Sequence, residues 1–175
     1  MKREIELKIF VEELGEIKKK LRKIGAKYEG VFREHDFFFD TPQEILKKKK
    51  ALLRLRIGDT RHFLTYKENL KSGQFKSADE YEVVVKNPQE LKKILEKIGF
   101  RVWFNYLKPR REYWSYRGNH LTLDSFPFGK FVEIEGSPKF IRGLAQKLNL
   151  DFTRSSAKSY IKLLRDYRKY KRLKI

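Results

Sequence analysis

The sequence predicts an α+β fold in which helices cover one antiparallel sheet. Three features predict it: segments in which apolar and charged residues alternate, segments with leucine and isoleucine at helical spacing, and short turn sequences between alternating segments. At 175 residues and 40% hydrophobic composition, the chain is long enough for a sizeable core. We therefore predict a single domain, residues 1–175, with about eight strands and three or four helices.

The first half of the chain begins with an alternating segment at residues 4–11, which predicts a strand with one apolar and one charged face. A helix is predicted at residues 14–24, where leucine and isoleucine recur at helical spacing before Gly25. Further strands are expected at residues 28–40, 53–57 and 61–68. The last two are joined by a turn at Gly58-Asp59, which indicates a hairpin.

The second half continues with a strand around residues 80–85 and a helix at 88–98 that has proline in its first turn. Glu-Ile-Glu and Glu-Tyr-Glu each precede a helix that ends in Lys-Ile-Gly. This similarity predicts an internal repeat of about 3–75 and 79–136. The remaining strands are expected at 103–116, 120–125 and 131–135, and C-terminal helices at 138–175.

Composition limits the classes of function. Cysteine is absent, which excludes disulfides and thiolate metal sites, so any metal must be held by carboxylates, imidazoles or water. The net charge of +19 favours a polyanionic partner without choosing among nucleic acid, membrane surface and phosphorylated metabolite. No signal-like or transmembrane-length apolar run is present, so we expect a cytoplasmic protein without a membrane partner. Abundant Lys, Arg and Glu indicate a thermophile.

The predicted strands share an unusual polar face, which carries charges where a solvated sheet face usually carries Thr, Ser and Gln. The residues are Glu4, Glu6, Lys8, Arg54, Arg56, Lys67, Glu80, Glu82, Asp124, Glu133 and Glu135. An open sheet would leave this face in water. A closed barrel would enclose it, and the enclosed charges would then have to be paired, hydrated or matched by a ligand. The alternation alone leaves both arrangements open.

The enclosed arrangement predicts a ligand that combines phosphate with metal. Cations would neutralise a polyphosphate, and the candidates are Lys8, Arg54, Arg56, Lys67 and one of Lys108, Arg110 and Arg111. Carboxylates would bind Mg²⁺ or Mn²⁺, and the candidates are Glu4, Glu6, Glu80, Glu82, Asp124, Glu133 and Glu135. The chain has no Gly-rich phosphate loop that would indicate a P-loop instead.

A series of motifs in a fixed order covers nearly the whole chain. It begins with Glu4-Ile5-Glu6-Leu7-Lys8 and His35-Asp36 before Phe37-Phe38-Phe39-Asp40. It continues with Leu53-Arg54-Leu55-Arg56, Thr65-Tyr66-Lys67, Glu80-Tyr81-Glu82, Leu123-Asp124 and Gly129-Lys130-Phe131-Val132-Glu133-Ile134-Glu135. The first motif resembles the Glu-x-Glu-x-Lys signature of the CYTH superfamily, and the whole series is similar to that superfamily's pattern. Its members include class IV adenylyl cyclases, thiamine triphosphatases and triphosphate tunnel enzymes.

The resemblance implies a closed or nearly closed eight-stranded antiparallel β-barrel, the triphosphate tunnel, with helices packed outside. It implies metal ligands or their supports at Glu4, Glu6, Asp124, Glu133 and Glu135, and phosphate contacts at Lys8, Arg54, Arg56 and Lys67. We assign the catalytic roles to Glu4, Glu6 and Lys8. Residues 36–42 are most similar to the cyclase branch, so an adenylyl cyclase that converts ATP to cyclic AMP and pyrophosphate is the leading hypothesis.

One motif departs from the family's pattern. The family has a Lys-x-Arg pair on the strand before Asp124, and Lys108 and Arg110 match it by spacing. Counting back from Asp124 favours Arg111 instead, in which case Pro109 takes the place of the lysine and one phosphate contact is lost.

Other functions remain open. An inorganic, thiamine or nucleoside triphosphatase would use the same residues, and a non-catalytic protein could bind a triphosphate, or RNA through the basic tail from Arg165 to Lys174. A homodimer is also open. Phe37 or Phe39 could line a base pocket, whereas Trp103 and Trp114 are typical of core or helix-packing positions.

Overall fold

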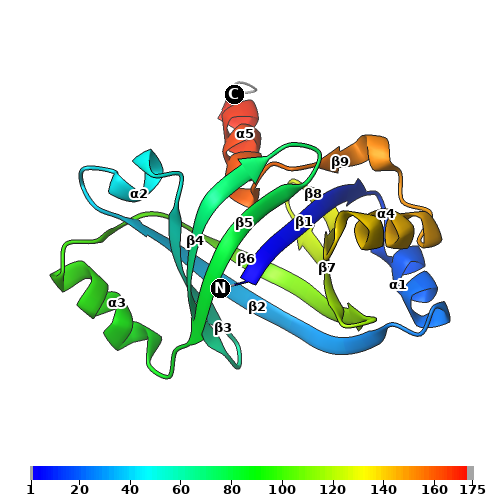
Figure 1. Ribbon diagram of the computed structural model, residues 1–175, viewed down its shortest axis with the longest axis horizontal. Helices are drawn as coiled ribbons and strands as arrows, with labels where there is room; N and C mark the ends of the chain where they lie inside the picture. Colours follow the sequence, from blue (N-terminus) through cyan, green and yellow to red (C-terminus); the bar gives the residue numbers. More distant parts are fainter. Residues whose placement is uncertain (1, 173–175) are drawn as a thin grey trace. The chain divides into compact units, whose positions relative to one another are not determined.

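The computed structural model describes residues 2–172, except the side chains of residues 72, 109, 110 and 170–172. Figure 1 follows the chain through its elements. The strands are β1 (Lys2–Val11), β2 (Lys27–Asp40), β3 (Leu52–Gly58), β4 (His62–Ser72), β5 (Lys76–Val84), β6 (Arg101–Tyr116), β7 (Asn119–Phe126), β8 (Gly129–Glu135) and β9 (Ser155–Ser156). The helices are α1 (Leu14–Lys23), α2 (Ile45–Lys48), α3 (Pro88–Lys97), α4 (Pro138–Lys147), the 3₁₀ turn η1 (Phe152–Arg154) and α5 (Tyr160–Arg172). The end of the predicted C-terminal helices and basic tail, residues 173–175, lies outside the described residues.

The strands form one sheet that closes on itself. Their order is β5-β4-β3-β2-β6-β7-β8-β1-β9, and β5 also pairs with β1. The pairings β1–β8, β2–β3, β3–β4 and β7–β8 are antiparallel. The eight long strands thus confirm the predicted closed antiparallel barrel with helices outside, and the short β9 beside β1 is an addition. Within the described residues, no helix is long and apolar enough to cross a membrane.

The alternation in the sequence determines the two faces of this sheet. In β1, Leu7 lies in an apolar core under the helices, while its neighbour Lys8 points to the opposite face. The register preserves this separation, because Leu7 lies opposite Ile134 and Lys8 lies opposite Glu133. The charged residues therefore gather on the face that the closed sheet turns inward, which we call the inner face.

Contacts divide the chain into two compact units whose segments interleave along the sequence. Unit 1 contains the residues up to 4 with residues 30–71 and 77–112, and unit 2 contains residues 5–29 and 72–76 with the residues from 113 onward. Each unit has its own apolar core.

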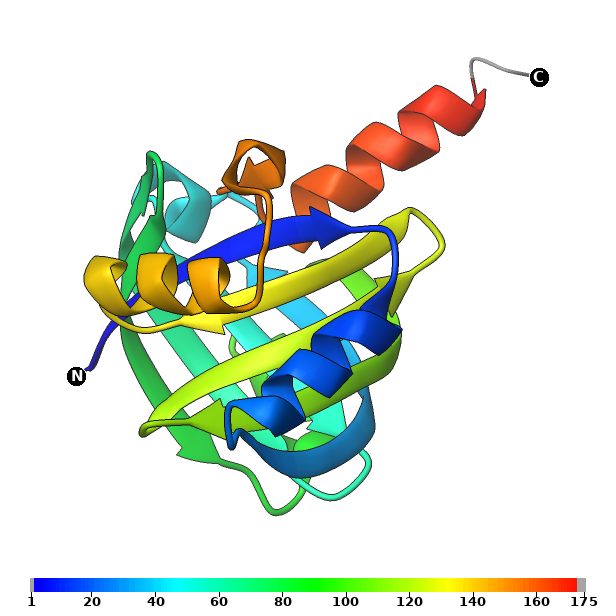
Figure 2. The same cartoon turned by 90° about the vertical axis from the view of Figure 1, so that its right-hand side faces the viewer.

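In unit 2, α1 and α4 cover the apolar faces of β1, β7 and β8 (Figure 2). The core contains Leu7, Ile9, Leu14, Ile17, Leu21, Trp114, Leu121, Leu123, Val132, Ile134, Ile141, Leu144, Ala145 and Leu148. Helix α4 begins at Pro138 because Ser137 accepts a 3.2 Å hydrogen bond from the backbone N–H of Phe140, and proline suits the first helical position.

In unit 1, α3 packs on the apolar faces of β2 and β3. The core contains Phe39, Leu53, Leu55 and Leu95, and Phe37 packs against it. Phe37 and Phe39, which the sequence suggested for a base pocket, therefore belong to this core. At the end of β2, Asp40 accepts hydrogen bonds from the backbone N–H groups of Thr41, Leu46 and Lys47. These bonds hold the four-residue helix α2 in a segment where only a connection was predicted.

Candidate functional site

Strands β2, β3 and β6 bring buried charges together on the inner face of unit 1. Asp36 is 0% exposed, and Arg56 binds it with two hydrogen bonds, from Nε to Oδ1 at 2.7 Å and from Nη2 to Oδ2 at 3.0 Å. The register places these two residues opposite each other, so the pair follows from the strand pairing. Nζ of Lys108 lies 3.3 Å from Oδ2 of Asp36.

Glu34 joins these residues from the preceding inner position of β2. Its Oε2 lies 3.1 Å from Nε of Arg56, 3.4 Å from Nζ of Lys108 and 3.7 Å from Nη1 of Arg111. We call Glu34, Asp36, Arg56, Lys108 and Arg111 the cation cluster. The concentration of buried positive charge on Arg56, Lys108 and Arg111 suits the binding of an anion.

Burial and neighbouring charges act against each other on the pKa values of the cation cluster. Burial raises the pKa of Glu34, but Arg56, Lys108 and Arg111 outweigh it and lower that pKa to about 2. The pKa of Asp36 lies well below its usual value for the same reason, since Arg56 and Lys108 overcome the effect of burial. Burial, together with Arg111 and Arg56, lowers the pKa of Lys108 to about 8. Both carboxylates are therefore ionised at neutral pH, and Lys108 is mostly charged.

Strand β6 changes the phase of its alternation between Lys108 and Arg111. Residues three apart in a regular strand point to opposite faces, yet both side chains contact Glu34 and are only 2% and 3% exposed. The change falls at Pro109 and Arg110, where a proline without an N–H group suits an irregular pairing. Lys108 and Arg111 thus both enter the cluster, although the sequence offered them as alternatives. The predicted role of Arg110 concerns a side chain outside the described ones.

Arg54 and Lys67, further predicted phosphate ligands, are held by other groups of unit 1. Nη2 of Arg54 donates a 3.1 Å hydrogen bond to Oγ1 of Thr65, and that hydroxyl donates a 2.7 Å hydrogen bond to Glu82. Nζ of Lys67 lies 2.7 Å from Glu80. In this structure, predicted phosphate ligands therefore contact predicted metal ligands.

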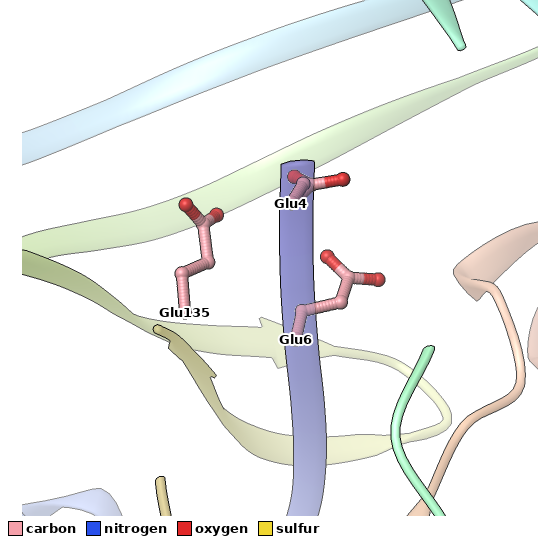
Figure 3. Close-up of side chains that lie close together, drawn as sticks. All are labelled: Glu4, Glu6 and Glu135. Atoms are coloured by element: carbon pink, nitrogen blue, oxygen red, sulfur yellow. The ribbon is translucent and has the colours of Figure 1, made fainter. Parts of the chain in front are cut away.

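A group of carboxylates lies along β1 and β8 (Figure 3). One oxygen from each of Glu4, Glu6 and Glu135 lies within 4.8 Å of the others, and we call these residues the carboxylate cluster. Glu4 and Glu6 share a face of β1, and the register places Glu135 opposite Glu6. Glu4 also contacts Lys67. Carboxylate oxygens are the ligands that Mg²⁺ and similar hard cations prefer, so this donor set fits the predicted metal.

Lys8 is a buried ammonium group held between two carboxylates. Its side chain is 3% exposed, and Nζ lies 2.7 Å from Glu6 and 2.6 Å from Glu133. Burial is the largest single influence on the pKa of Lys8 and lowers it, but Glu133 and Glu6 together raise it above its usual value. Lys76 also contacts Glu6, at 2.6 Å. Lys8 is therefore charged at neutral pH and orients both glutamates.

Asp124, another predicted metal ligand, is fully buried on β7. Its Oδ2 accepts a 2.6 Å hydrogen bond from the hydroxyl of Tyr160 and a 3.3 Å hydrogen bond from Thr122. Tyr160 is the first residue of α5, and its ring centroid lies 4.9 Å from Nζ of Lys8. The basic C-terminal helix is thus connected to the inner face of unit 2 by its first residue.

The predicted site residues fall into separate groups in the structure. Among the predicted phosphate ligands, Arg56, Lys108 and Arg111 come together in the cation cluster. Among the predicted metal ligands, only Glu4, Glu6 and Glu135 form a cluster within the part of the chain that the structure describes. The others contact cations or hydroxyl groups: Glu80, Glu82, Asp124 and Glu133.

Sequence reasoning missed Glu34, Asp36 and Tyr160 as members of these groups. Glu34 and Asp36 do carry a signal, because they stand two apart in a predicted strand. Arg33 precedes Glu34, and His35 lies between Glu34 and Asp36. Both faces of the strand therefore look polar, and the signal is weak. Tyr160 lies in a helix near other tyrosines, and nothing in the sequence separates it from them.

A closed antiparallel barrel whose inner face carries paired cations and carboxylates is a triphosphate-tunnel fold. The model of one family, described as the CYTH domain, matches residues 2–163. The chain therefore belongs to the CYTH domain family.

Individual relatives agree with this assignment. A Methanocaldococcus jannaschii protein named "putative adenylate cyclase" is 24% identical over 135 residues, which are 77% of each chain. A Pyrococcus horikoshii structure whose name states no activity has 28% identity and a TM-score of 0.77, covering 91% of this chain and 98% of that one. A Hippeastrum structure, named for an adenylyl cyclase with dominant triphosphatase activity, has 18% identity and a TM-score of 0.67, covering 95% and 96%, and shows the same fold.

Proposed function

We propose that this protein binds a triphosphate compound together with a divalent metal ion and cleaves it, with conversion of ATP to cyclic AMP and pyrophosphate as the leading reaction. One observation carries the proposal: three buried cations gather in unit 1, and three carboxylates cluster along β1 and β8. A polyphosphate with its metal ion is the common ligand that needs both. Family membership and the name of the M. jannaschii relative support this function.

The cation cluster supplies the phosphate-binding chemistry of the proposal. Arg56, Lys108 and Arg111 would bind phosphate oxygens, partly in place of the contacts they now make with Glu34. Asp36 keeps Arg56 oriented through two hydrogen bonds. Because these groups are buried, their attraction to an anion is stronger than it would be in water. Their charge would also stabilise the departing pyrophosphate.

The carboxylate cluster supplies the metal site of the proposal. Glu4, Glu6 and Glu135 would hold Mg²⁺ or Mn²⁺, which when bound lowers the pKa of an attacking hydroxyl group and screens phosphate charge. Lys8 would keep Glu6 and Glu133 in position. In the cyclisation, the ribose 3′-oxygen forms a bond to the α-phosphorus, the bond from that phosphorus to the pyrophosphate oxygen breaks, and the hydroxyl proton is released. No side chain has to act as nucleophile.

A triphosphatase is the second candidate. The Hippeastrum relative favours it, because its name states a dominant triphosphatase activity for a "putative adenylyl cyclase". The same cations and carboxylates would serve, with water attacking the terminal phosphorus and orthophosphate leaving.

Product analysis tests the proposal. The protein is incubated with ATP, inorganic triphosphate or thiamine triphosphate, with Mg²⁺, with Mn²⁺ or with a chelator. Cyclic AMP with pyrophosphate establishes the cyclase, and orthophosphate establishes the triphosphatase. If neither product forms up to the unfolding temperature while a triphosphate raises that temperature, the protein is a binder and the enzymatic part is overturned. If no triphosphate raises the unfolding temperature either, the whole proposal is overturned.

A further inference from the structure

An aromatic group lies beside the cation cluster, and the chemistry proposed above does not use it. Phe38 stands two residues after Asp36 on β2, and Tyr106 stands two residues before Lys108 on β6. β2 and β6 are neighbours in the sheet (Figure 1). Side chains two apart on a strand share a face and are separated by about 7 Å. The aromatic rings therefore begin one side chain beyond the buried charges.

Phe38 is at the centre of this group. Its ring centroid lies 6.0 Å from that of Tyr106, with the two rings nearly parallel at 5°, and 6.1 and 6.2 Å from those of Trp103 and Phe104. Trp103 and Phe104 lie 5.8 Å apart, and Phe104 and Tyr106 lie 5.9 Å apart. We call these four residues the aromatic group. Nζ of Lys108 lies 5.8 Å from the Tyr106 centroid, so the group is continuous with the cation cluster.

The exposure of the four rings is uneven. Phe38 and Tyr106 are 4% and 8% exposed, whereas Trp103 is 45% exposed. The other tryptophan, Trp114, is 1% exposed in the core of unit 2, so exposure is particular to Trp103. The indole of Trp103 packs against Phe38 and Phe104 and is partly open to solvent. It therefore offers a surface on which a flat aromatic ring can stack.

We propose that the aromatic group binds the nucleobase of a nucleoside triphosphate whose phosphates are held by the cation cluster. This inference rests on the proposed function and adds the residue that selects nucleotides among triphosphate compounds. A nucleotide has a phosphate chain at one end, an aromatic base at the other and a ribose between them, which matches the order of charges and rings along β2 and β6. An inorganic triphosphate has no part for the rings to contact. Trp103 is then a specificity-determining residue that favours nucleotides over inorganic triphosphate.

Binding measurements with two uncleavable probes test this assignment. The probes are diimidotriphosphate and a methylene-bridged ATP analogue, each titrated calorimetrically with Mg²⁺ into the wild type, Trp103→Ala and Trp103→Phe. We expect Trp103→Ala to weaken binding of the ATP analogue about tenfold or more, because stacking on an aromatic side chain contributes that much per base. Binding of diimidotriphosphate stays within about twofold of the wild type. Trp103→Phe retains a ring and keeps most of the preference.

A matched control comes from Leu107, which is 54% exposed on the same strand and lies outside the aromatic group. Leu107→Ala should change the affinity for neither probe. Tryptophan fluorescence gives a second readout, since Trp114 is buried in another core. The ATP analogue should change the emission of the wild type and not that of Trp103→Phe, while diimidotriphosphate should change neither.

The outcomes separate this inference from the function on which it rests. If the wild type binds both probes and Trp103→Ala weakens both equally or weakens neither, the base site is overturned and the triphosphate site stands. If the wild type binds neither probe, the proposed function fails and the base site fails with it. If Trp103→Ala loses its circular dichroism signal, that variant is unfolded. Trp103→Phe and the fluorescence measurement then decide whether the base site exists.

Discussion

The cation cluster of unit 1 and the group around Lys8 in unit 2 use the same residue types in opposite proportions. In the cation cluster, three cations share Glu34 and Asp36. Around Lys8 the carboxylates outnumber the cations: Lys8 contacts Glu6 and Glu133, Lys76 also contacts Glu6, and Glu135 lies opposite Glu6. Burying charges of one sign in excess is unfavourable without a partner of the other sign. We therefore expect the close pair of Arg56 and Asp36 to support the fold, and the cations of unit 1 and the carboxylates along β1 and β8 to bind the ligand.

The largest effect is expected where pairing is complete, at Asp36. Arg56→Ala removes both hydrogen bonds to a fully buried carboxylate, so we expect the free energy of unfolding to fall by about 3–5 kcal/mol. Arg33→Ala is the matched control, because Arg33 is 72% exposed and pairs with Asp59 at the surface; it should cost less than about 1 kcal/mol. Urea unfolding measures both.

Equal losses in these two variants would show that burial does not distinguish the two arginines. The double variant Asp36→Asn, Arg56→Met removes the pair together and should recover part of the stability, because no buried charge is then left without its partner. This second variant keeps the test valid if Arg56→Ala does not fold.

The second prediction concerns the carboxylate cluster. Glu4→Gln, Glu135→Gln removes two of the three clustered charges, so metal-dependent turnover should fall about 100- to 1000-fold. Stability should fall only slightly, because the removal of repulsion within the cluster offsets the loss of the Glu4–Lys67 ion pair and Lys67 keeps its contact with Glu80. Glu29→Gln, an exposed site in unit 2, is the control and should keep full turnover. A large fall in melting temperature with turnover intact would reverse the roles assigned to the two groups.

The third prediction uses acid to weaken the cation cluster. The pKa of Glu34 falls from its ordinary value of 4.5 to about 2 in the folded protein. A depressed folded pKa stabilises the protein above the ordinary value, and this stability is lost as pH falls from about 4.5 toward 2. We expect a loss of up to about 3 kcal/mol from this group. Urea unfolding at several acid pH values should show a shallower pH dependence in Glu34→Gln than in Glu29→Gln, and identical slopes would refute the assignment.

The smallest expected effect appears at alkaline pH and concerns the same cation cluster. Lys108, which contacts Glu34 and Asp36 beside Arg56 and Arg111, loses its charge above a pKa of about 8. The arginines and carboxylates do not titrate there, so affinity for diimidotriphosphate should fall several-fold, up to about tenfold, between pH 7 and pH 9. Lys108→Arg stays charged and should show a flatter pH dependence. A wild type with constant affinity over this range would exclude Lys108 from the anion site.

The strands were predictable because their residues alternate cleanly over most of them, whereas closure into a barrel was predicted from the resemblance to the CYTH superfamily. In β1 and β3, apolar residues occupy every second position, so the inner positions of Glu6, Lys8, Arg54 and Arg56 could be read directly from the sequence. The pairing between them could not be read. Which carboxylate contacts which cation depends on the strand order and register, and these are set by contacts far apart in the sequence.

Two parts of the site escaped prediction for specific reasons. In β2, polar residues fill positions 33 to 36 without interruption, so alternation gives no phase and Glu34 and Asp36 were overlooked. The same uncertainty of phase directed the base-pocket hypothesis to Phe37 or Phe39, whereas Phe38 is the residue beside the buried charges. In β6, Lys108 and Arg111 were predicted as alternatives, because residues three apart in a regular strand face opposite ways. The change of phase between them brings both into contact with Glu34.

The change of phase between Lys108 and Arg111 also constrains where relatives can gain or lose a residue in β6. Lys108 contacts the inner-face carboxylates, whereas Trp114, an even number of positions later, lies in the apolar core of unit 2. Deletion of Pro109 or Arg110 would leave Lys108 and Arg111 two positions apart, so a regular strand would place both on the inner face and Trp114 on the opposite face, as they are now. We therefore expect relatives that share this cluster to tolerate a single-residue gap at Pro109 or Arg110, while a gap between Arg111 and Trp114 would turn the following side chains to the opposite face. The chain length between Arg111 and Trp114 is thus inherited as strictly as a core residue.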